Sequence, residues 1–539
     1  MSSDTDSYDV VIVGAGAGGA SAAWAYAKLG KKVCLIERGD WPLKMDYPGN
    51  FIDWERRRHN EFSYDPNIRQ NKADYLIDNS KSSIRAANFN GVGGSTVLYS
   101  GHFPRFHPSD FHTQSLDKVG DDWPIKYEDL LPYYELNDKN MNVSGLVGDT
   151  AYPDMQPLSR PIPIGSYGST LGKAFNDLGW HWWPSYSAIS TTSNSGRVPC
   201  QNIGPCNTGC PSGAKSSVDV TYVQSAIKLG VKVLVNSPVL DLISNESEVK
   251  GVLAKVDGKT TKILAKIVVV ACNAIGTARL LLSHVSTLEK KIQKNISDHL
   301  GKNLMLHPLG YAEAILPHPT DVNSGPQGCC IFSHQFYETQ KSASFKRGYT
   351  MHVLRGSAGV DDVIRGIDRS DIRFGESFIK NFNDTKDRMA VMTIICEDLP
   401  RRSNEVYLTE KTDRDGLKVA GIKYELDENT KKMLSNGLGN AKKLFKAAGG
   451  KRIRVTGPVS DAGWHILGTA RMGDDISNSA TSRIGEVHGL KRLFIADGSL
   501  FTTSSGVNPA STIQALALYV AENSSQKYLG SKDLLHEVD

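Results

Sequence analysis

Three of the chain's eight cysteines fall within eleven residues, in the stretch "PCQNIGPCNTGCP" from Pro199 to Pro211. Five residues separate Cys200 from Cys206, and three separate Cys206 from Cys210. Thiolates gathered in a loop rich in glycine and proline can converge on one centre, and three of them suit a three-iron cluster or a four-iron cluster with an open corner. Zinc would lack a fourth ligand close by. A second interpretation stays open, in which the cysteines act as small apolar residues of a turn-rich loop.

Gly14, Gly16 and Gly19 form a second chemically suggestive series, with the pattern G-x-G-x-x-G. The first glycine permits a tight turn, the second lets the backbone approach a pyrophosphate, and the third packs a helix on a strand. Glu37 stands at the end of the next apolar run, where a carboxylate can accept both ribose hydroxyls. Glu rather than Arg favours a ribose with a free 2′-hydroxyl, as in FAD or NAD.

The segments around these glycines predict a parallel β-α-β unit. The run "DVVIV" at 9–13 is continuously apolar, as a buried parallel strand requires. The alanine-rich stretch 20–30 predicts a helix whose N-terminus faces the phosphates, and "KVCLIE" at 32–37 predicts the second strand.

Two later segments favour FAD over NAD. Gly93, Gly94 and Ser95 belong to a second glycine-rich loop, whose amides can contact a second phosphate or a flavin ring. Near the C-terminus, "LFIADGS" at 493–499 predicts a buried strand, and 509–522 predicts a helix. The N-terminus of that helix would face an anionic group.

Composition excludes several classes of protein. A chain of 539 residues requires at least two domains, and its 40% hydrophobic and 22% charged residues are ordinary for a soluble globular protein. The net charge of +4 and the lack of a basic run with interleaved aromatics argue against nucleic-acid binding. No segment approaches the roughly twenty apolar residues of a membrane span. The polar N-terminus shows no secretion signal, so a cytoplasmic location is the default expectation, with periplasmic co-export beside a signal-bearing partner left open.

Together these motifs resemble the glucose–methanol–choline (GMC) oxidoreductases over essentially the whole chain. The resemblance rests on the N-terminal glycine series, "GVGGST", "LGKNLMLHP" at 300–308, and a final series H-x-x-G-T-x-R-M-G, "ADGS" and "NPA". The most similar branch oxidises sugars and polyols. It includes glucose, gluconate and glucoside dehydrogenases and pyranose or glycoside oxidases.

The resemblance implies an α/β fold with two domains. A Rossmann-type FAD-binding domain would carry an inserted α+β substrate-binding domain, built on a mostly antiparallel sheet. The FAD-binding domain would be discontinuous, over residues 1–45, 80–110, 195–310 and 455–539. The substrate-binding domain would comprise residues 46–79, 111–194 and 311–454.

The resemblance also implies roles for single residues. By position, these would be Gly14, Gly16, Gly19 and Glu37 for the ADP half of FAD; Gly93, Gly94 and Ser95 for the pyrophosphate and flavin; Val239 for the adenine; and Asp497, Gly498, Asn508, Pro509 and Thr512 for the isoalloxazine end.

The family's catalytic pair falls on His465 and Asn508. Imidazole accepts a proton near neutral pH, so His465 would take the proton of an alcohol while its carbon gives a hydride to flavin N5. Asn508 would orient the substrate oxygen and stabilise the developing alkoxide, and it could also cap the helix that follows. His307, in "MLHP", is predicted to be structural.

The expected function is oxidation of a secondary alcohol of a sugar or glycoside, of the pyranose C2 or C3 type, with electrons passed to a non-oxygen acceptor. The alternatives are an oxidase that produces hydrogen peroxide and a non-catalytic flavin-binding protein.

Two further expectations concern the cofactors. Some sugar-oxidising relatives carry a His in the "GGST" loop that bonds to the flavin. Val97, Leu98 and Tyr99 occupy that region here, with His102 the only nearby candidate, so FAD is predicted to be non-covalent. Some relatives also bind a three-iron cluster on a similar cysteine array. This implies an electron exit through Cys200, Cys206 and Cys210 to a cytochrome or small-subunit partner.

Overall fold

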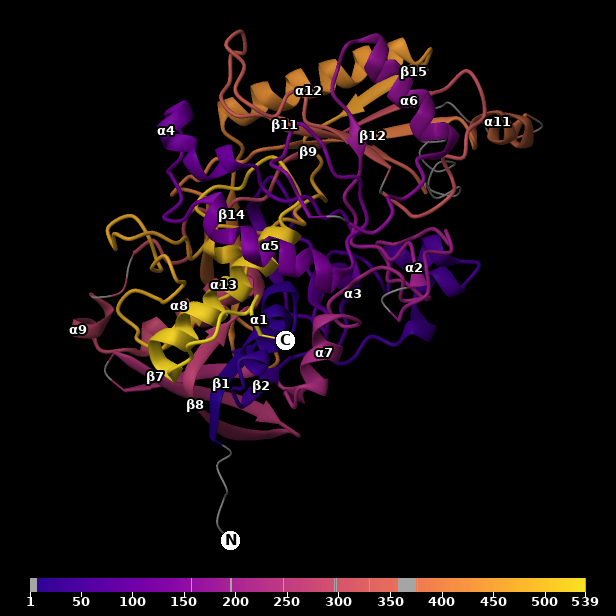
Figure 1. Cartoon of the computed structure of the whole chain (residues 1–539). Coiled ribbons are helices and arrows are strands. Elements are labelled where there is room, and N and C mark those ends of the chain that lie inside the picture. The colour runs from indigo at the N-terminus through magenta and orange to yellow at the C-terminus, as the bar shows by residue number, and fades with distance from the viewer. Residues whose placement is uncertain are drawn as a thin grey trace.

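The computed structural model describes residues 7–538 except 157, 194–195, 246, 295, 297, 329, 357–374 and 376. Three sheets organise these described residues. Figure 1 shows strands β1, β2 and β8 at one end of the molecule and β9, β11, β12 and β15 at the other. The two larger sheets therefore lie at opposite ends of the molecule.

The first sheet has seven strands, in the order β5-β2-β1-β8-β7-β6, with β16 also paired to β8. Its core strand, β1, is apolar and buried, and it pairs in parallel with β2 and β8 on either side. Parallel neighbours require crossover connections, which helices supply. The strand bounds are β1 (Ser7–Val13), β2 (Val33–Ile36), β5 (Lys232–Leu234), β6 (Val239–Asn245), β7 (Glu248–Val256), β8 (Lys259–Val270) and β16 (Leu493–Ile495).

Helices cover this sheet. α1 follows β1 directly and packs against α13, which packs in turn on α5. Ten of the twelve residues of α1 and twelve of the twenty residues of α13 are buried, which suits helices in the middle of a layered core. The larger helices here are α1 (Ala17–Lys28), α5 (Tyr127–Met141), α7 (Tyr222–Lys228), α8 (Asn273–Thr287) and α13 (Ala510–Leu529).

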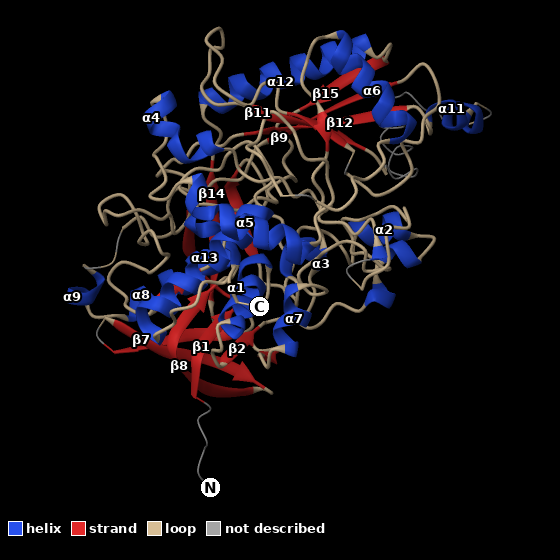
Figure 2. Cartoon of the chain, in the orientation of Figure 1, coloured by secondary structure: helices blue, strands red, loops and turns tan. Residues whose placement is uncertain are grey.

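The second sheet has six strands, in the order β15-β9-β12-β11-β10-β4, and its neighbours pair antiparallel. Helix α12 lies across it, as Figure 2 shows, and buries an apolar face against β9, β11 and β12. The bounds are β4 (Trp183–Pro184), β9 (Leu309–Ile315), β10 (Ile331–Ser333), β11 (Tyr349–Leu354), β12 (Met389–Cys396), β15 (Lys451–Thr456), α6 (Gly165–Asp177) and α12 (Glu428–Ala447).

A third sheet, in the order β13-β14-β3, packs on α8. The remaining elements are short. They are β3 (Ile77–Ser82), β13 (Glu405–Thr412), β14 (Lys418–Tyr424), α2 (Trp54–His59), α3 (Pro66–Arg69), α4 (Thr113–Asp117), α9 (Lys290–Gln293), α11 (Phe378–Thr385), η1 (Lys44–Asp46), η2 (Pro48–Asn50), η3 (Gly94–Val97), η4 (Pro108–His112) and η6 (Gly498–Leu500).

The predicted fold class is confirmed, with a largely parallel sheet flanked by helices and a separate antiparallel sheet. The division into domain segments stays a prediction. Within the described part of the chain, no helix combines the length and the apolar character needed to cross a bilayer.

Candidate active site

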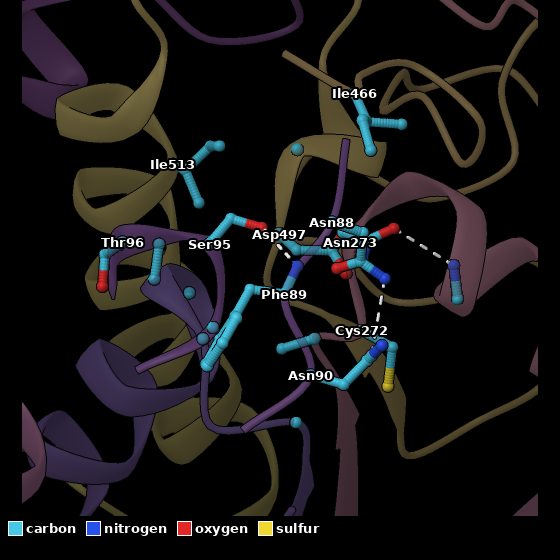
Figure 3. Close-up of a pocket in the computed structure, with 18 of the residues that line it drawn as sticks. Asn88, Phe89, Asn90, Ser95, Thr96, Cys272, Asn273, Ile466, Asp497 and Ile513 are labelled. Atoms are coloured by element: carbon cyan, nitrogen blue, oxygen red, sulfur yellow. Dashed lines mark hydrogen bonds between the residues drawn. The ribbon is translucent and has the colours of Figure 1, made fainter. Parts of the chain in front are cut away.

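A long cavity lies at the carboxyl ends of β1, β2 and β8, where Val13, Ile36 and Ala271 line it. In open α/β sheets this edge is where ligands bind. Most of the predicted site residues line the cavity, and Figure 3 shows part of its wall. They are Gly14, Gly16, Glu37, Gly94, Ser95, Val239, His465, Asp497, Gly498, Asn508 and Pro509.

The two glycine-rich turns meet in the middle of the cavity. Gly94 adopts a left-handed conformation, with φ of 51°, and a Cβ atom added there would lie 2.7 Å from the Cα of Gly16. Helix α1 starts at this point with Gly16 as its N-cap. It has no side-chain cap and no acidic residue in its first turn. Backbone amides at such a helix start favour an anion, so this is a place for a pyrophosphate.

Glu37 and Val239 both line the cavity. The Glu37 carboxylate is buried and accepts hydrogen bonds from the N–H groups of Ala15 at 2.9 Å and Gly39 at 3.0 Å. Burial raises the pKa of this carboxyl group. Because a carboxylate offers about four lone-pair sites, Glu37 retains acceptor capacity for ribose hydroxyls.

Asp497 lies further along the wall, at the end of β16. Its carboxylate accepts from Thr277 Oγ1 at 2.5 Å and from the Ser499 N–H at 2.8 Å. Figure 3 shows Asp497 beside Asn273, whose amide donates to Asn88 Oδ1 at 3.3 Å. These polar groups hold β16, α8 and the loop before η3 together around the cavity.

His465 and Asn508 lie together in the cavity wall. Asn508 Nδ2 lies 3.3 Å from His465 Nε2, and His307 Nδ1 lies 2.9 Å from His465 Nδ1. Removal of the imidazole from water lowers the pKa of His465 well below its ordinary value. His465 is therefore a neutral imidazole at pH 7, as a general base must be before it accepts a proton.

Aromatic and polar side chains also line the cavity. Tyr64 and Trp464 line the cavity and contact each other edge to face, with ring centroids 5.4 Å apart. Trp464 is 38% exposed, so the cavity reaches the surface beside it. Asn207, Ser100 and His102 add polar groups to the lining.

Three predicted residues lie outside the lining. Gly19 packs α1 on β1, since a Cβ there would lie 1.9 Å from the Gly14 carbonyl oxygen. Gly93 turns the chain beside Asp219, with φ of 100°. The Thr512 hydroxyl lies 2.8 Å from Tyr134 Oη on α5.

The expected iron–sulfur site is not supported. Among the described residues, no group of three or more His, Cys, Asp or Glu side chains is arranged to hold a metal ion. Cys206 Sγ donates to the Gly204 carbonyl at 3.3 Å, and Cys210 Sγ accepts from the Lys215 N–H at 3.4 Å. Cys200 packs beside a small apolar cluster of Ile162 and Ile189. Cys206 and Cys210 make local hydrogen bonds and Cys200 packs on apolar neighbours, so the structure gives no support for the cluster interpretation.

Two functional candidates escaped the sequence interpretation. His307 contacts His465 directly, although "MLHP" alone suggested a structural residue. Asn207, inside the cysteine stretch, reaches the cavity wall with a buried amide oxygen that has no hydrogen-bond partner among the described residues. Only the position of His307 in a motif already tied to the site could have signalled the first. No sequence signal marks the second.

Comparison with known proteins extends over the whole site. Sequence profiles described as GMC oxidoreductase match residues 8–309 and 400–517. The 2-methyl-1,2-propanediol dehydrogenase of Mycolicibacterium austroafricanum is 33% identical over 538 residues, which span 98% of this chain and 97% of that protein. The fructose dehydrogenase large subunit of Gluconobacter japonicus is 26% identical, over 97% of this chain and 98% of that protein.

Solved structures share the fold. Pyridoxine 4-oxidase from Mesorbium loti superposes with a TM-score of 0.68 at 17% identity, covering 96% of this chain and 99% of that one. A formate oxidase superposes with a TM-score of 0.66 at 14% identity, covering 98% of this chain and all of that one. At such low identity the likeness concerns architecture alone.

Proposed function

Because this chain belongs to the GMC oxidoreductase family, whose members bind FAD and oxidise alcohol groups, we propose that it oxidises a hydroxyl group of a polyhydroxy substrate at the His465–Asn508 end of its cavity. The observation that carries the proposal is the meeting of a neutral imidazole and a side-chain amide in one cavity with two glycine-rich turns.

The residues present fit FAD. The Glu37 carboxylate and Val239 suit the adenosine end, and the turns at Gly16 and Gly94 leave room where a Cβ would intrude. The start of α13, after Pro509, has neither a side-chain cap nor an acidic residue in its first turn, so it suits the polar edge of the flavin. When bound, the flavin supplies an acceptor for the substrate's hydride. With aliphatic Val97 and Leu98 in the loop after Ser95, the cofactor would be held without a covalent bond.

His465 acts as the base in this proposal. Its Nε2 lies beside the amide of Asn508, so an alcohol oxygen in contact with both groups would meet an acceptor for its proton and a donor for the charge that remains. Asn508 Oδ1 is buried and lacks a hydrogen-bond partner in the described part of the chain. A buried amide oxygen without a donor is costly, and a substrate hydroxyl would satisfy it.

The side chains that line the cavity indicate the class of substrate. Trp464 and Tyr64 offer aromatic faces, and Ser100, His102 and Asn207 offer polar groups, a mixture that suits a molecule with several hydroxyls. A secondary alcohol of a sugar or glycoside, of the pyranose C2 or C3 type, is our first candidate. A small 1,2-diol is the second, because the 33% identical relative is a diol dehydrogenase.

For the electron acceptor we propose a non-oxygen compound or a protein partner, as in a dehydrogenase. Two of the similar proteins reported above are dehydrogenases, and one is the large subunit of an assembly. An oxidase remains the alternative reaction.

The test is anaerobic mixing of the FAD-loaded protein with methyl pyranosides, free sugars, 1,2-diols and simple mono-alcohols. Bleaching of flavin absorbance with a polyhydroxy compound, and weaker bleaching with mono-alcohols of equal carbon number, is expected. Absence of bleaching by every alcohol would contradict the proposal. Admission of air, with a peroxide assay, then separates oxidase from dehydrogenase.

A further inference from the structure

We propose that His307 is a positioning residue that fixes the tautomer of His465, so that the bare Nε2 of His465 faces the cavity. The importance of this for the reaction rests on the proposed function, but the tautomer itself does not. The inference follows from three contacts that leave each ring nitrogen of the two histidines a single role.

The first step concerns His307 Nε2. It lies 2.9 Å from the carbonyl oxygen of Ser504 and 2.8 Å from that of Ser505. Carbonyl oxygens only accept hydrogen bonds, so Nε2 of His307 must carry the proton. Burial lowers the pKa of His307 to about 4, which leaves the ring neutral at pH 7. Its Nδ1 is therefore a lone-pair acceptor.

The second step assigns the ring proton of His465. His465 Nδ1 lies 2.9 Å from the bare Nδ1 of His307, so it must donate and carry the proton. Since His465 is also neutral, its Nε2 is left with a lone pair. Asn508 Nδ2, a donor, lies 3.3 Å from this nitrogen, and its orientation agrees with the assignment. The base is thus oriented before any substrate arrives.

The surroundings keep His307 in place. The imidazole is fully buried, and the residue adopts a left-handed backbone with φ of 48°, which is uncommon for His. The preceding Leu306 N–H donates to Asp398 Oδ2 at 2.8 Å. Asp398 also donates its own N–H to Ser504 Oγ at 2.8 Å, which fixes the chain that supplies the two carbonyls. Acceptors and imidazole therefore belong to one rigid unit.

The arrangement also serves the protonated state. When Nε2 of His465 takes the alcohol proton, the O–H bond breaks and an N–H bond forms, and the ring becomes a cation. Its Nδ1–H then donates to a neutral imidazole instead of facing another charge. The titratable groups that act on His465 are His307, His102 and His352, and the ring centroids of His102 and His352 lie 4.6 Å apart.

The decisive variants are His307→Asn and His307→Gln. Asn tolerates the left-handed backbone and places an acceptor oxygen as many bonds from Cα as the imidazole Nδ1. Gln keeps a donor for the two carbonyls but loses the acceptor at the Nδ1 position. Each variant therefore preserves one half of the contacts, which separates tautomer control from general support of the fold.

Two readouts are compared at pH 7. In anaerobic rapid mixing with the best alcohol, His307→Gln is expected to reduce its flavin ~10²-fold more slowly than wild type, and His307→Asn within ~10-fold of it. Independently, ¹⁵N-histidine NMR should show His465 protonated at Nδ1 in the wild type and in His307→Asn, but shifted toward Nε2 protonation in His307→Gln. His465→Gln identifies the signals.

A wild-type spectrum with the proton on His465 Nε2 would overturn the inference, as would equal rate losses in two variants that both bind FAD and melt like the wild type. If no alcohol reduces the wild-type flavin, the proposed function fails, while the NMR result still decides the tautomer.

Discussion

Two groups of reactive side chains in this molecule differ in how they are arranged in space. At the cavity, His465, His307 and Asn508 come from separate parts of the sequence, and His465 lies within hydrogen-bond distance of the other two. The cysteines of 199–211 are close in sequence, yet no metal-holding group forms there among the residues that the structure describes. Closeness in the sequence therefore predicts a shared site less well than closeness in the folded structure.

The difference has a physical origin. Asn508 stands two residues before the first residue of α13, and His465 lies in an irregular segment. The His465 ring contacts both His307 and Asn508, so side-chain contacts between separate segments fix the pair. The cysteine stretch is a loop tied down from behind by Lys215, whose Nζ donates to the carbonyls of Val97, Tyr99 and Cys206 at 2.7 Å each. That lysine is 1% exposed, so its three hydrogen bonds lie in the interior.

Replacement of His465 by Ala should have the largest effect. Loss of the proton acceptor should slow anaerobic flavin reduction by ~10³-fold, within the range that general bases contribute. FAD binding should persist, because the cavity contacts at Glu37 and the glycine turns are untouched. Flavin content by absorbance is the control. A variant that binds FAD but keeps the wild-type rate would contradict the role of His465 as the base.

Acidification should destabilise the fold through His307. Its folded pKa is about 4 and the unfolded value is about 6.5. The unfolded chain therefore binds the proton first, and stability present above pH 6.5 is lost as the pH falls toward 4. Over that window His307 should account for about 3 kcal/mol. Urea unfolding at pH 7 and pH 4.5 should show a smaller acid loss in His307→Asn than in wild type.

Lys215→Met tests the cysteine stretch and should destabilise the fold. The substitution keeps an apolar stem of similar length but leaves three carbonyl groups without their shared donor. A loss of ~2 kcal/mol in the free energy of unfolding is expected. Denaturant titration measures it. Treatment with an iron chelator should leave the melting temperature of the wild type unchanged, and a fall after chelation would restore the cluster interpretation.

The smallest effect is expected for Cys210→Ala. Cys210 Sγ accepts only a 3.4 Å contact from the Lys215 N–H and lies 3.4 Å from Ser212 Oγ. Loss of these weak contacts should change the flavin reduction rate by less than ~2-fold and stability by less than ~1 kcal/mol. Iron analysis of wild type and variant should give the same value, near zero per flavin.

Much of the fold was predictable because its signals are local. The apolar run before Gly14 predicts β1, and residues 509–522 predict α13, since a buried parallel strand and a buried helix each leave a continuous pattern. Resemblance then supplied His465 and Asn508 as a pair. Their convergence in one cavity agrees with that assignment, while their roles stay proposals.

The rest depended on tertiary contacts that no spacing encodes. The role of His307 arises from carbonyls at Ser504 and Ser505, nearly two hundred residues away in the sequence. Asn207 lies in the cavity wall in a segment held by tertiary contacts, since Lys215 Nζ donates to the neighbouring Cys206 carbonyl and the Asn207 N–H donates to Gln327 Oε1. The three thiols could not be placed from their intervals, because backbone turns decide whether side chains converge.

The most direct test of the account compares two FAD-loaded variants with the wild type in a single anaerobic rapid-mixing series: His465→Asn, and a triple variant with Cys200→Ser, Cys206→Ser and Cys210→Ser. The account predicts that the first loses alcohol-driven flavin reduction by ~10³-fold and the second stays within ~3-fold of wild type. A triple variant that loses reduction while His465→Asn retains it would contradict the central claim.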